Sequence, residues 1–412
     1  MTELSSKRVT AVDRLRGLCM VLVIFQFALG ALGSTFESWA PLIEHGGDGF
    51  QVLPGVAFAD LFAPCFIFIV GMTLTRTFAS REAKYGTGRA YFEMAVRFLS
   101  LIGAGVVLTA VEDGWFGLLE GDTFADIYLN MKLFMIGAVV VAALILLSII
   151  AAISKNEGFQ AKASAALHYV LAVLGVMTLF FIAVSAGERT GSHYYEDFPT
   201  NRFGKYIWDT LQNIGLAGLV ALPFVKLSKW GKLTVTLSTF AFVAVYVQCG
   251  GLKYFSDMVE GAPYACLTWG GILLLGSFFM DLREDKKKYW AFSLGFLVGA
   301  VILIAALGVV AQKRGCTPAY ALLTAGMASL IFGIMDALDG WNPKFKPLTW
   351  WGGSCILTYA VNYIVCLLIG AYFEINEVEI SVGFGIVIAL ALAVLYTLMN
   401  YALYKKDKHV RL

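Results

Sequence analysis

The feature that most constrains this chain is a succession of apolar runs, each long enough for one membrane-spanning helix, that recurs from end to end. A helix needs about 20 such residues to cross the hydrocarbon core of a bilayer. The polar segments between the runs are short. We therefore predict an all-α, polytopic integral membrane bundle of about 12 transmembrane helices, with spans at 16–36, 57–76, 94–111, 133–153, 164–186, 207–225, 233–250, 264–281, 290–311, 318–336, 348–372 and 380–403.

The composition excludes the main alternatives to a membrane protein. Hydrophobic residues make up 59% of the chain, charged residues make up 15%, and the mean hydropathy is +0.74. Soluble domains have about 45–50% apolar and about 25% charged residues, so this chain is neither disordered, nor a nucleic-acid-binding protein, nor a secreted disulfide scaffold. The seven cysteines form no C-x-x-C pair and the four histidines form no H-E-x-x-H motif, so we expect no metal site.

The distribution of charge predicts the orientation in the membrane. If the N-terminus is cytoplasmic and the sides alternate, most of the 31 lysines and arginines fall in inner segments, for example in 283–288 and 405–411. Acidic residues gather in an outer loop at 112–126. Cytoplasmic loops of membrane proteins are rich in Lys and Arg, so we predict that both termini are cytoplasmic. Because every loop is short, we expect a single transmembrane domain over 1–412 without a soluble domain.

Two ionisable residues lie within predicted spans, where charge is costly and often functional. Asp60 is at the outer end of the second span, and Arg97 is about one turn inside the third. Asp60 has two interpretations, a functional carboxylate or a helix-start carboxylate that the helix dipole favours. Arg97 is either a ligand-binding cation or an anchor whose charge extends to the interface.

Two histidines are expected in outer loops, His45 and His193. Histidine is suited to proton transfer near neutral pH. His45 lies about 15 residues before Asp60, on the connection that leads into the same helix. A neighbouring carboxylate orients an imidazole and supports its charged form, so the pair is a candidate general base. The alternative is that both histidines are only solvated.

A compact basic cluster lies at the inner end of the first span. It consists of Arg8, Arg14 and Arg16 with Asp13, in "RVTAVDRLRGLCM". The cluster is either an anchor that sets the topology or a phosphate site, because the guanidinium offers a fork of donors that matches phosphate oxygens.

Five segments, in order along the chain, resemble the heparan-α-glucosaminide N-acetyltransferase family, which has bacterial members and belongs to a wider superfamily of transmembrane acyltransferases. Asp13, Arg16 and Gly17 match its opening motif, and Asp60 matches its second motif in "LPGVAFADLFAPCFIFIVGM". Gln212 matches a third. The last two are similar to "CTPAYALLTAGMASLI" and "PLTWWGGSCILTYAVNYIV".

The resemblance implies a transferase that takes an acetyl or other acyl group from cytoplasmic acyl-CoA to an amino sugar or glycan at the outer face. It implies acetyl-CoA as the donor, in the inner membrane of a bacterium, with 133–186 as an inserted helical pair. His45 lies farther from Asp60 than the family's histidine lies from its aspartate. The implied roles are acyl-CoA binding by Arg14, Arg16 and Arg97, catalysis by His45 and Asp60, and acceptor binding by Gln212, Asn362 and His193.

A transporter or permease is the competing hypothesis, in which Asp60 serves as a coupling or binding carboxylate. The two hypotheses differ in the role of His45, which a transferase needs for chemistry and a permease can lose. Gln212 and Asn362 have an alternative use in helix packing. The sequence leaves homo-oligomerisation open.

Overall fold

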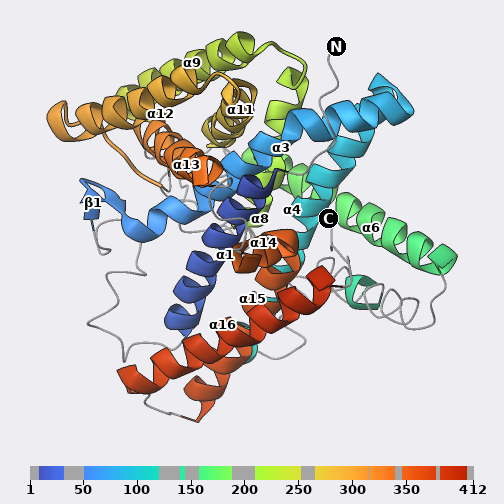
Figure 1. The fold of residues 1–412 in the computed structure, drawn as a ribbon. Helices are drawn as coiled ribbons and strands as arrows, with labels where there is room; N and C mark the ends of the chain where they lie inside the picture. The colour runs from blue at the N-terminus through green and yellow to red at the C-terminus, as the bar shows by residue number, and fades with distance from the viewer. Residues whose placement is uncertain are drawn as a thin grey trace. The chain divides into compact units, whose positions relative to one another are not determined.

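The computed structural model describes residues 9–31, 51–119, 140–143, 157–187, 209–251, 265–313, 315–338, 346–376 and 381–405. Nearly all of these residues are helical, and a small antiparallel sheet, β1 (Gln51–Leu53) with β2 (Val56–Ala57), precedes α3 (Figure 1). The long helices are α1 (Thr10–Ala31), α3 (Phe62–Tyr85), α4 (Thr87–Leu119), α6 (Glu157–Gly187), α8 (Thr210–Ala221), α9 (Lys229–Tyr246), α11 (Cys266–Leu282), α12 (Lys286–Val301), α13 (Pro318–Leu338), α14 (Lys346–Gly353), α15 (Cys355–Ile375) and α16 (Val382–Lys405). The short 3-10 and π segments are η3 (Phe58–Leu61), η4 (Leu222–Phe224), η5 (Val247–Gly251) and η7 (Ile302–Ala306).

Seven helices of the described part are long and apolar enough to cross a membrane, and the bent pair α14 and α15 makes eight if it is one span. The seven coincide with seven predicted spans, so the prediction of an all-α chain with membrane-spanning helices is confirmed. Two further apolar helices, Thr210–Phe224 and Cys266–Leu282, are shorter. Most of the predicted span 133–153 lies outside the described residues. Twelve spans and cytoplasmic termini therefore stay predictions.

The predicted span 348–372 is not one straight helix. α14 and α15 meet at Ser354 with a bend of 79°. The bend follows Gly352 and Gly353, and paired Gly and Ser residues are common where helices kink sharply. The first backbone bond of α15 runs from the Thr358 N–H to the Ser354 carbonyl, at 3.0 Å.

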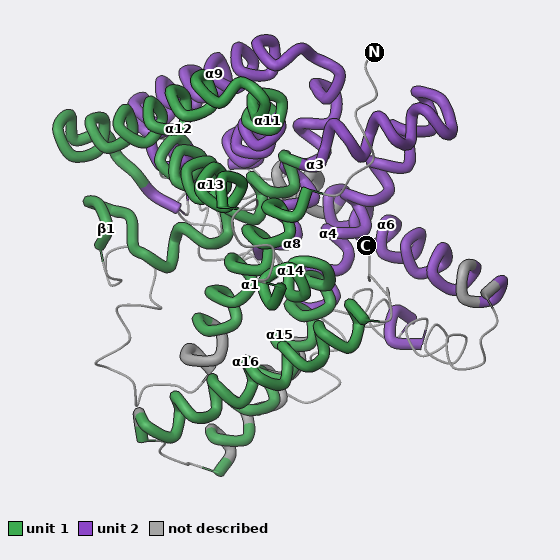
Figure 2. Tube along the Cα trace, in the orientation of Figure 1, with its two compact units in different colours: residues 1–72, 278–311, 322–411 green, residues 73–277, 312–321, 412 purple. Residues whose placement is uncertain are grey.

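The chain divides into two compact units, each assembled from separate segments (Figure 2). Unit 1 contains 1–72, 278–311 and 322–411, and unit 2 contains 73–277 and 312–321. The predicted single transmembrane domain stays a prediction.

In unit 1, α1 packs against α14, α15 and α16. The backbones of α1 and α14 approach each other at two glycines. A Cβ atom on Gly17 would lie under 3.0 Å from the carbonyl oxygen of Leu348, and one on Gly352 would lie equally close to that of Asp13. Small residues allow this close approach in membrane bundles. The opening motif of the chain thus lies directly against its closing motif.

In unit 2, α4 packs against α6 and α8. Gly103 of α4 faces the carbonyl of Leu171, and Gly175 of α6 faces the carbonyl of Leu99, so the same small-residue packing recurs. α6 is part of the predicted inserted pair 133–186. Apart from 140–143, the first helix of that pair lies outside the described residues.

Candidate functional site

The structure places the predicted site residues in two groups. Arg14, Arg16, Asp60 and Asn362 belong to unit 1, whereas Arg97 and Gln212 belong to unit 2. His45 and His193, the two candidate proton-transfer and acceptor residues, lie outside the described residues.

Asp60 lies in η3, the short turn from which α3 continues. Its side chain is fully buried, and Oδ2 accepts a hydrogen bond from the Ala57 N–H at 2.9 Å. A carboxylate in the first turn satisfies a backbone donor and interacts favourably with the positive end of the helix dipole. This contact is the helix-start role that the sequence allows for Asp60, and a further role for the carboxylate needs a separate test.

The basic cluster of α1 is an ion pair rather than a row of solvated charges. Asp13 and Arg14 are buried, and the Arg16 side chain keeps 22% of its surface exposed. Arg16 Nη1 donates to Asp13 Oδ1 at 3.3 Å and to the Gly352 carbonyl oxygen at 3.4 Å. Hydrogen bonds of this length are at the weak end of the range. Both acceptors share the same guanidinium nitrogen.

Arg16 belongs to α1, and its guanidinium contacts the C-terminal end of α14. At a helix C-terminus the dipole favours a cation, and the last carbonyls lack intrahelical donors. The Nε and Nη2 groups of Arg16 donate to no residue that the structure describes. Because the guanidinium is a rigid planar fork, the edge formed by these groups stays available for a bidentate contact with a phosphate or carboxylate. The binding of a phosphate by Arg16 stays a prediction.

Asn362 is buried on α15, and its Oδ1 accepts a hydrogen bond from the Cys366 thiol one turn later, at 3.4 Å. Gln212 is fully buried on α8 of unit 2, with its carboxamide against the backbone at Gly105 of α4. Arg97 is partly buried on α4. The amide of Gln212 therefore contributes to helix packing, whatever else it does.

Sequence reasoning missed a buried polar cluster in unit 2. Lys232 is almost completely buried in the first turn of α9. Its Nζ donates to Thr75 Oγ1 and to Ser277 Oγ, both at 2.9 Å, and the two hydroxyls are 2.6 Å apart. The cluster ties α9 to α3 and α11. In the sequence, Lys232 follows Lys226 and Lys229 in one short basic segment, and such a segment indicates only orientation.

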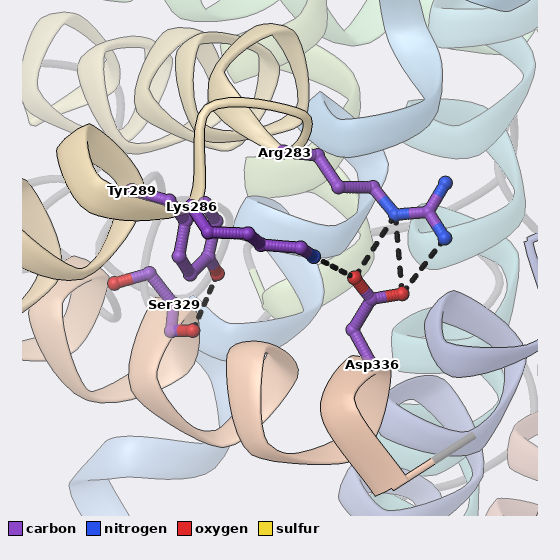
Figure 3. A network of polar contacts seen from close by, with 5 residues as sticks. All are labelled: Arg283, Lys286, Tyr289, Ser329 and Asp336. Atoms are coloured by element: carbon purple, nitrogen blue, oxygen red, sulfur yellow. Dashed lines mark hydrogen bonds and ion pairs between the residues drawn. The ribbon is translucent and has the colours of Figure 1, made fainter. Parts of the chain in front are cut away.

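A second missed cluster lies between the start of α12 and the end of α13 in unit 1 (Figure 3). Arg283 approaches both carboxylate oxygens of Asp336, with a closest distance of 2.8 Å, and Lys286 Nζ lies 2.7 Å from Asp336 Oδ2. Nearby, the Tyr289 hydroxyl donates to the Ser329 carbonyl. Two cations on one buried carboxylate fix the connection between α11 and α12 onto α13.

Among the residues that the structure describes, no three His, Cys, Asp or Glu side chains form a group that could hold a metal ion. No family model and no curated protein matches the chain. The resemblance to the acetyltransferase family is therefore carried by the motif residues alone.

Proposed function

We propose that the protein is an integral membrane acyltransferase that moves an acetyl or other acyl group from acyl-CoA at the cytoplasmic face to an amino sugar or glycan at the outer face. The observation that carries the proposal is the position of Arg16. One nitrogen of its guanidinium is held by Asp13 and the end of α14, and the opposite edge is available. A partly exposed, preorganised guanidinium is suited to a phosphate of CoA.

The proposed chemistry is nucleophilic attack by the acceptor amine or hydroxyl on the thioester carbonyl. His45 removes the proton of the attacking group, and the proton is returned to the departing thiolate of CoA. A general base must lie within hydrogen-bond reach of that proton. Asp60 is proposed to orient or charge the imidazole. The role of His45 rests on the sequence, since the residue lies outside the described part of the chain.

A permease is the second candidate, and the break between α14 and α15 favours it. In many transporters the substrate site is formed by interrupted helices whose ends face the ligand. The break at Ser354 is of this kind, with a bend of 79°.

Incubation of the purified protein with labelled acetyl-CoA and a panel of amino sugars separates the two candidates. The acyltransferase proposal expects label on an acceptor, and His45→Ala should lower turnover by about 10²–10⁴-fold while acyl-CoA binding persists. His193→Ala is measured alongside, because it is the other histidine expected on the outer side. Solute uptake into vesicles without acyl transfer, unaffected by either substitution, would favour the permease.

Acyl-CoA binding tests the role of Arg16 directly. Arg16→Ala should weaken binding by about 10- to 150-fold, the equivalent of one charge-assisted hydrogen bond, and the loss should shrink as salt rises. Arg81→Ala is the matched control. Arg81 has a similar exposure, 29%, and pairs with Glu93 in unit 2, so its loss should leave binding unchanged. Equal effects of the two substitutions would contradict a phosphate contact at Arg16.

The two roles of Asp60 are separable by two substitutions. Asn is as good as Asp at a helix start, so Asp60→Asn should retain stability, whereas Asp60→Ala should lower it. If Asp60 also charges the imidazole, Asp60→Asn should impair turnover despite normal stability. Full turnover in a stable Asp60→Asn variant would restrict Asp60 to the helix start.

A further inference from the structure

A buried row of uncharged polar side chains lies between α15 and α16 in unit 1. Three of them are spaced four residues apart on α15, a fourth lies four residues before these at the break, and two are spaced four apart on α16. Such spacing places each set on one helix face. All six are buried, and we call them the polar seam: Ser354 at the break, Thr358, Asn362 and Cys366 of α15, and Tyr396 and Asn400 of α16.

A hydrogen bond between Thr358 and Asn400 joins α15 to α16 along the polar seam. Thr358 Oγ1 lies 3.0 Å from Asn400 Oδ1 and also 3.0 Å from the Ser354 carbonyl oxygen. A hydroxyl has one proton, so it serves these two acceptors in turn. One turn away on α16, the ring of Tyr396 packs edge-on against Trp351 of α14, with 6.3 Å between centroids.

Two atoms of the polar seam have no hydrogen-bond partner among the described residues, the Tyr396 hydroxyl and Asn400 Nδ2. Both side chains are at least 99% buried. Polar residues that only hold helices together bond to each other across the interface. Buried polar groups are otherwise nearly always satisfied, and in a membrane no bulk water substitutes for the partner. A bond across the interface therefore accounts for Thr358, and a bond within α15 accounts for Asn362 Oδ1, but these two atoms stay unexplained.

The two atoms define the chemistry of a bound group. Asn400 Nδ2 can only donate, and the Tyr396 hydroxyl can donate or accept. None of the six side chains of the polar seam carries a charge at neutral pH, so nothing in it compensates a bound ion. With its carboxamide placed in this way, Asn400 favours an uncharged group that accepts a hydrogen bond.

We propose that the polar seam binds an uncharged hydrogen-bonding group. The group is either an ordered water or the hydroxyl or amide of an uncharged part of a substrate. Buried waters typically bridge polar atoms that lack protein partners. The substrate source rests on the proposed function, because the pantetheine arm of acyl-CoA and the ring of an N-acetylated amino sugar carry such groups.

The decisive measurement is the stability of Tyr396→Phe, which deletes only the hydroxyl. If a bound group satisfies that hydroxyl, the apparent melting temperature of the purified protein should fall as far as in Tyr289→Phe. Tyr289 is the matched control, because it is equally buried and its hydroxyl visibly donates to the Ser329 carbonyl. Removing a hydroxyl that has no partner is neutral or stabilising. An unchanged or raised melting temperature in Tyr396→Phe overturns the proposal.

Asn400→Leu gives a second reading if Tyr396→Phe cannot be purified. Thr358 keeps the Ser354 carbonyl as its acceptor, so this substitution leaves no donor of the protein without a partner. With a bound group at Asn400 Nδ2 the melting temperature should fall, and without one it should stay or rise. Neither melting temperature depends on acyl transfer. The bound group at the polar seam can therefore be refuted without refuting the proposed acyltransferase, and the acyltransferase can be refuted without refuting the bound group.

Labelling of Cys366 assigns the source of the group. Variants that keep only Cys366 or only Cys65 are treated with 2-aminoethyl methanethiosulfonate. The two thiols have the same exposure, 4%, and Cys65 lies outside the polar seam. If a substrate enters, pantetheine or N-acetylglucosamine should slow labelling at Cys366 by several-fold and leave Cys65 unchanged. If the melting temperature falls and neither compound protects Cys366, the bound group is water.

Discussion

The close approach of α1 and α14 predicts the effect of one added methyl group, Gly17→Ala. A Cβ atom at Gly17 would lie under 3.0 Å from the Leu348 carbonyl oxygen. The obstacle is backbone, so it can move only if one helix moves relative to the other. Such a movement also shifts the Gly352 carbonyl, to which Arg16 donates.

The expected cost follows from two opposing effects. Overpacking a close contact costs about 1–3 kcal/mol, and a rigid carbonyl places this contact in the upper part of that range. Replacing Gly by Ala inside a helix gains up to about 1 kcal/mol. We therefore expect Gly17→Ala to lose about 1–2 kcal/mol in net stability, with weaker acyl-CoA binding as a second effect.

The measurement is the apparent melting temperature of the purified protein in micelles, followed by size-exclusion chromatography. Gly299→Ala is the control, because Gly299 lies in α12 of the same unit and a Cβ atom there would meet nothing within 4 Å. Only the gain in helix propensity remains in that variant, so it should be neutral or stabilised. A Gly17→Ala protein that is as stable as Gly299→Ala would refute the close packing of α1 on α14.

Three further predictions concern the missed clusters and the topology. Ser277→Ala removes one acceptor from the Lys232 ammonium and should cost about 1.5–3 kcal/mol; an unchanged melting temperature would show that the cluster is not formed. Lys286→Ala should lower the free energy of unfolding by under about 1 kcal/mol, because its side chain is 59% exposed. Asp336→Asn should lower it more, since this buried carboxylate pairs with two cations. The reverse order in thermal unfolding would contradict the network. A reporter that works only in the cytoplasm should be active at the C-terminus and silent after Glu120; a silent C-terminal fusion that is stably expressed would contradict the predicted orientation.

Hydropathy predicts the helices of this chain because a crossing helix requires little more than length and apolar composition. It does not report the direction of the chain inside an apolar run. The predicted span 348–372 contains the break at Ser354, and an average over a window does not register it. The consecutive residues Gly352, Gly353 and Ser354 are a local signal for a kink. Only the structure shows that the bend reaches 79°.

The candidate site was predictable only where its chemistry is local. The charges of Asp13 and Arg16 are neighbours in the sequence, and their ion pair follows from the spacing of three residues on a helix. The contact of Arg16 with Gly352 spans 336 residues, and no local pattern reveals it. Lys232 was missed for the same reason, because Thr75 and Ser277 lie on two other helices.

Arg16 has an observed contact and a proposed one. Its Nη1 group donates to Asp13 and to the Gly352 carbonyl near the break, and its other nitrogens are proposed to bind phosphate. Arg16→Lys separates the two. An ammonium can still reach the Gly352 carbonyl or Asp13, and it remains a cation at the end of α14, so stability should change little. The lysine ammonium is a single nitrogen without the planar fork of the guanidinium, so the proposed bidentate contact with phosphate is lost. We therefore expect Arg16→Lys to keep the melting temperature of the parent protein while it weakens acyl-CoA binding, whereas Arg16→Ala lowers both. If Arg16→Lys binds acyl-CoA as tightly as the parent protein, Arg16 makes no bidentate contact with phosphate, and its role is the structural one at Asp13 and Gly352.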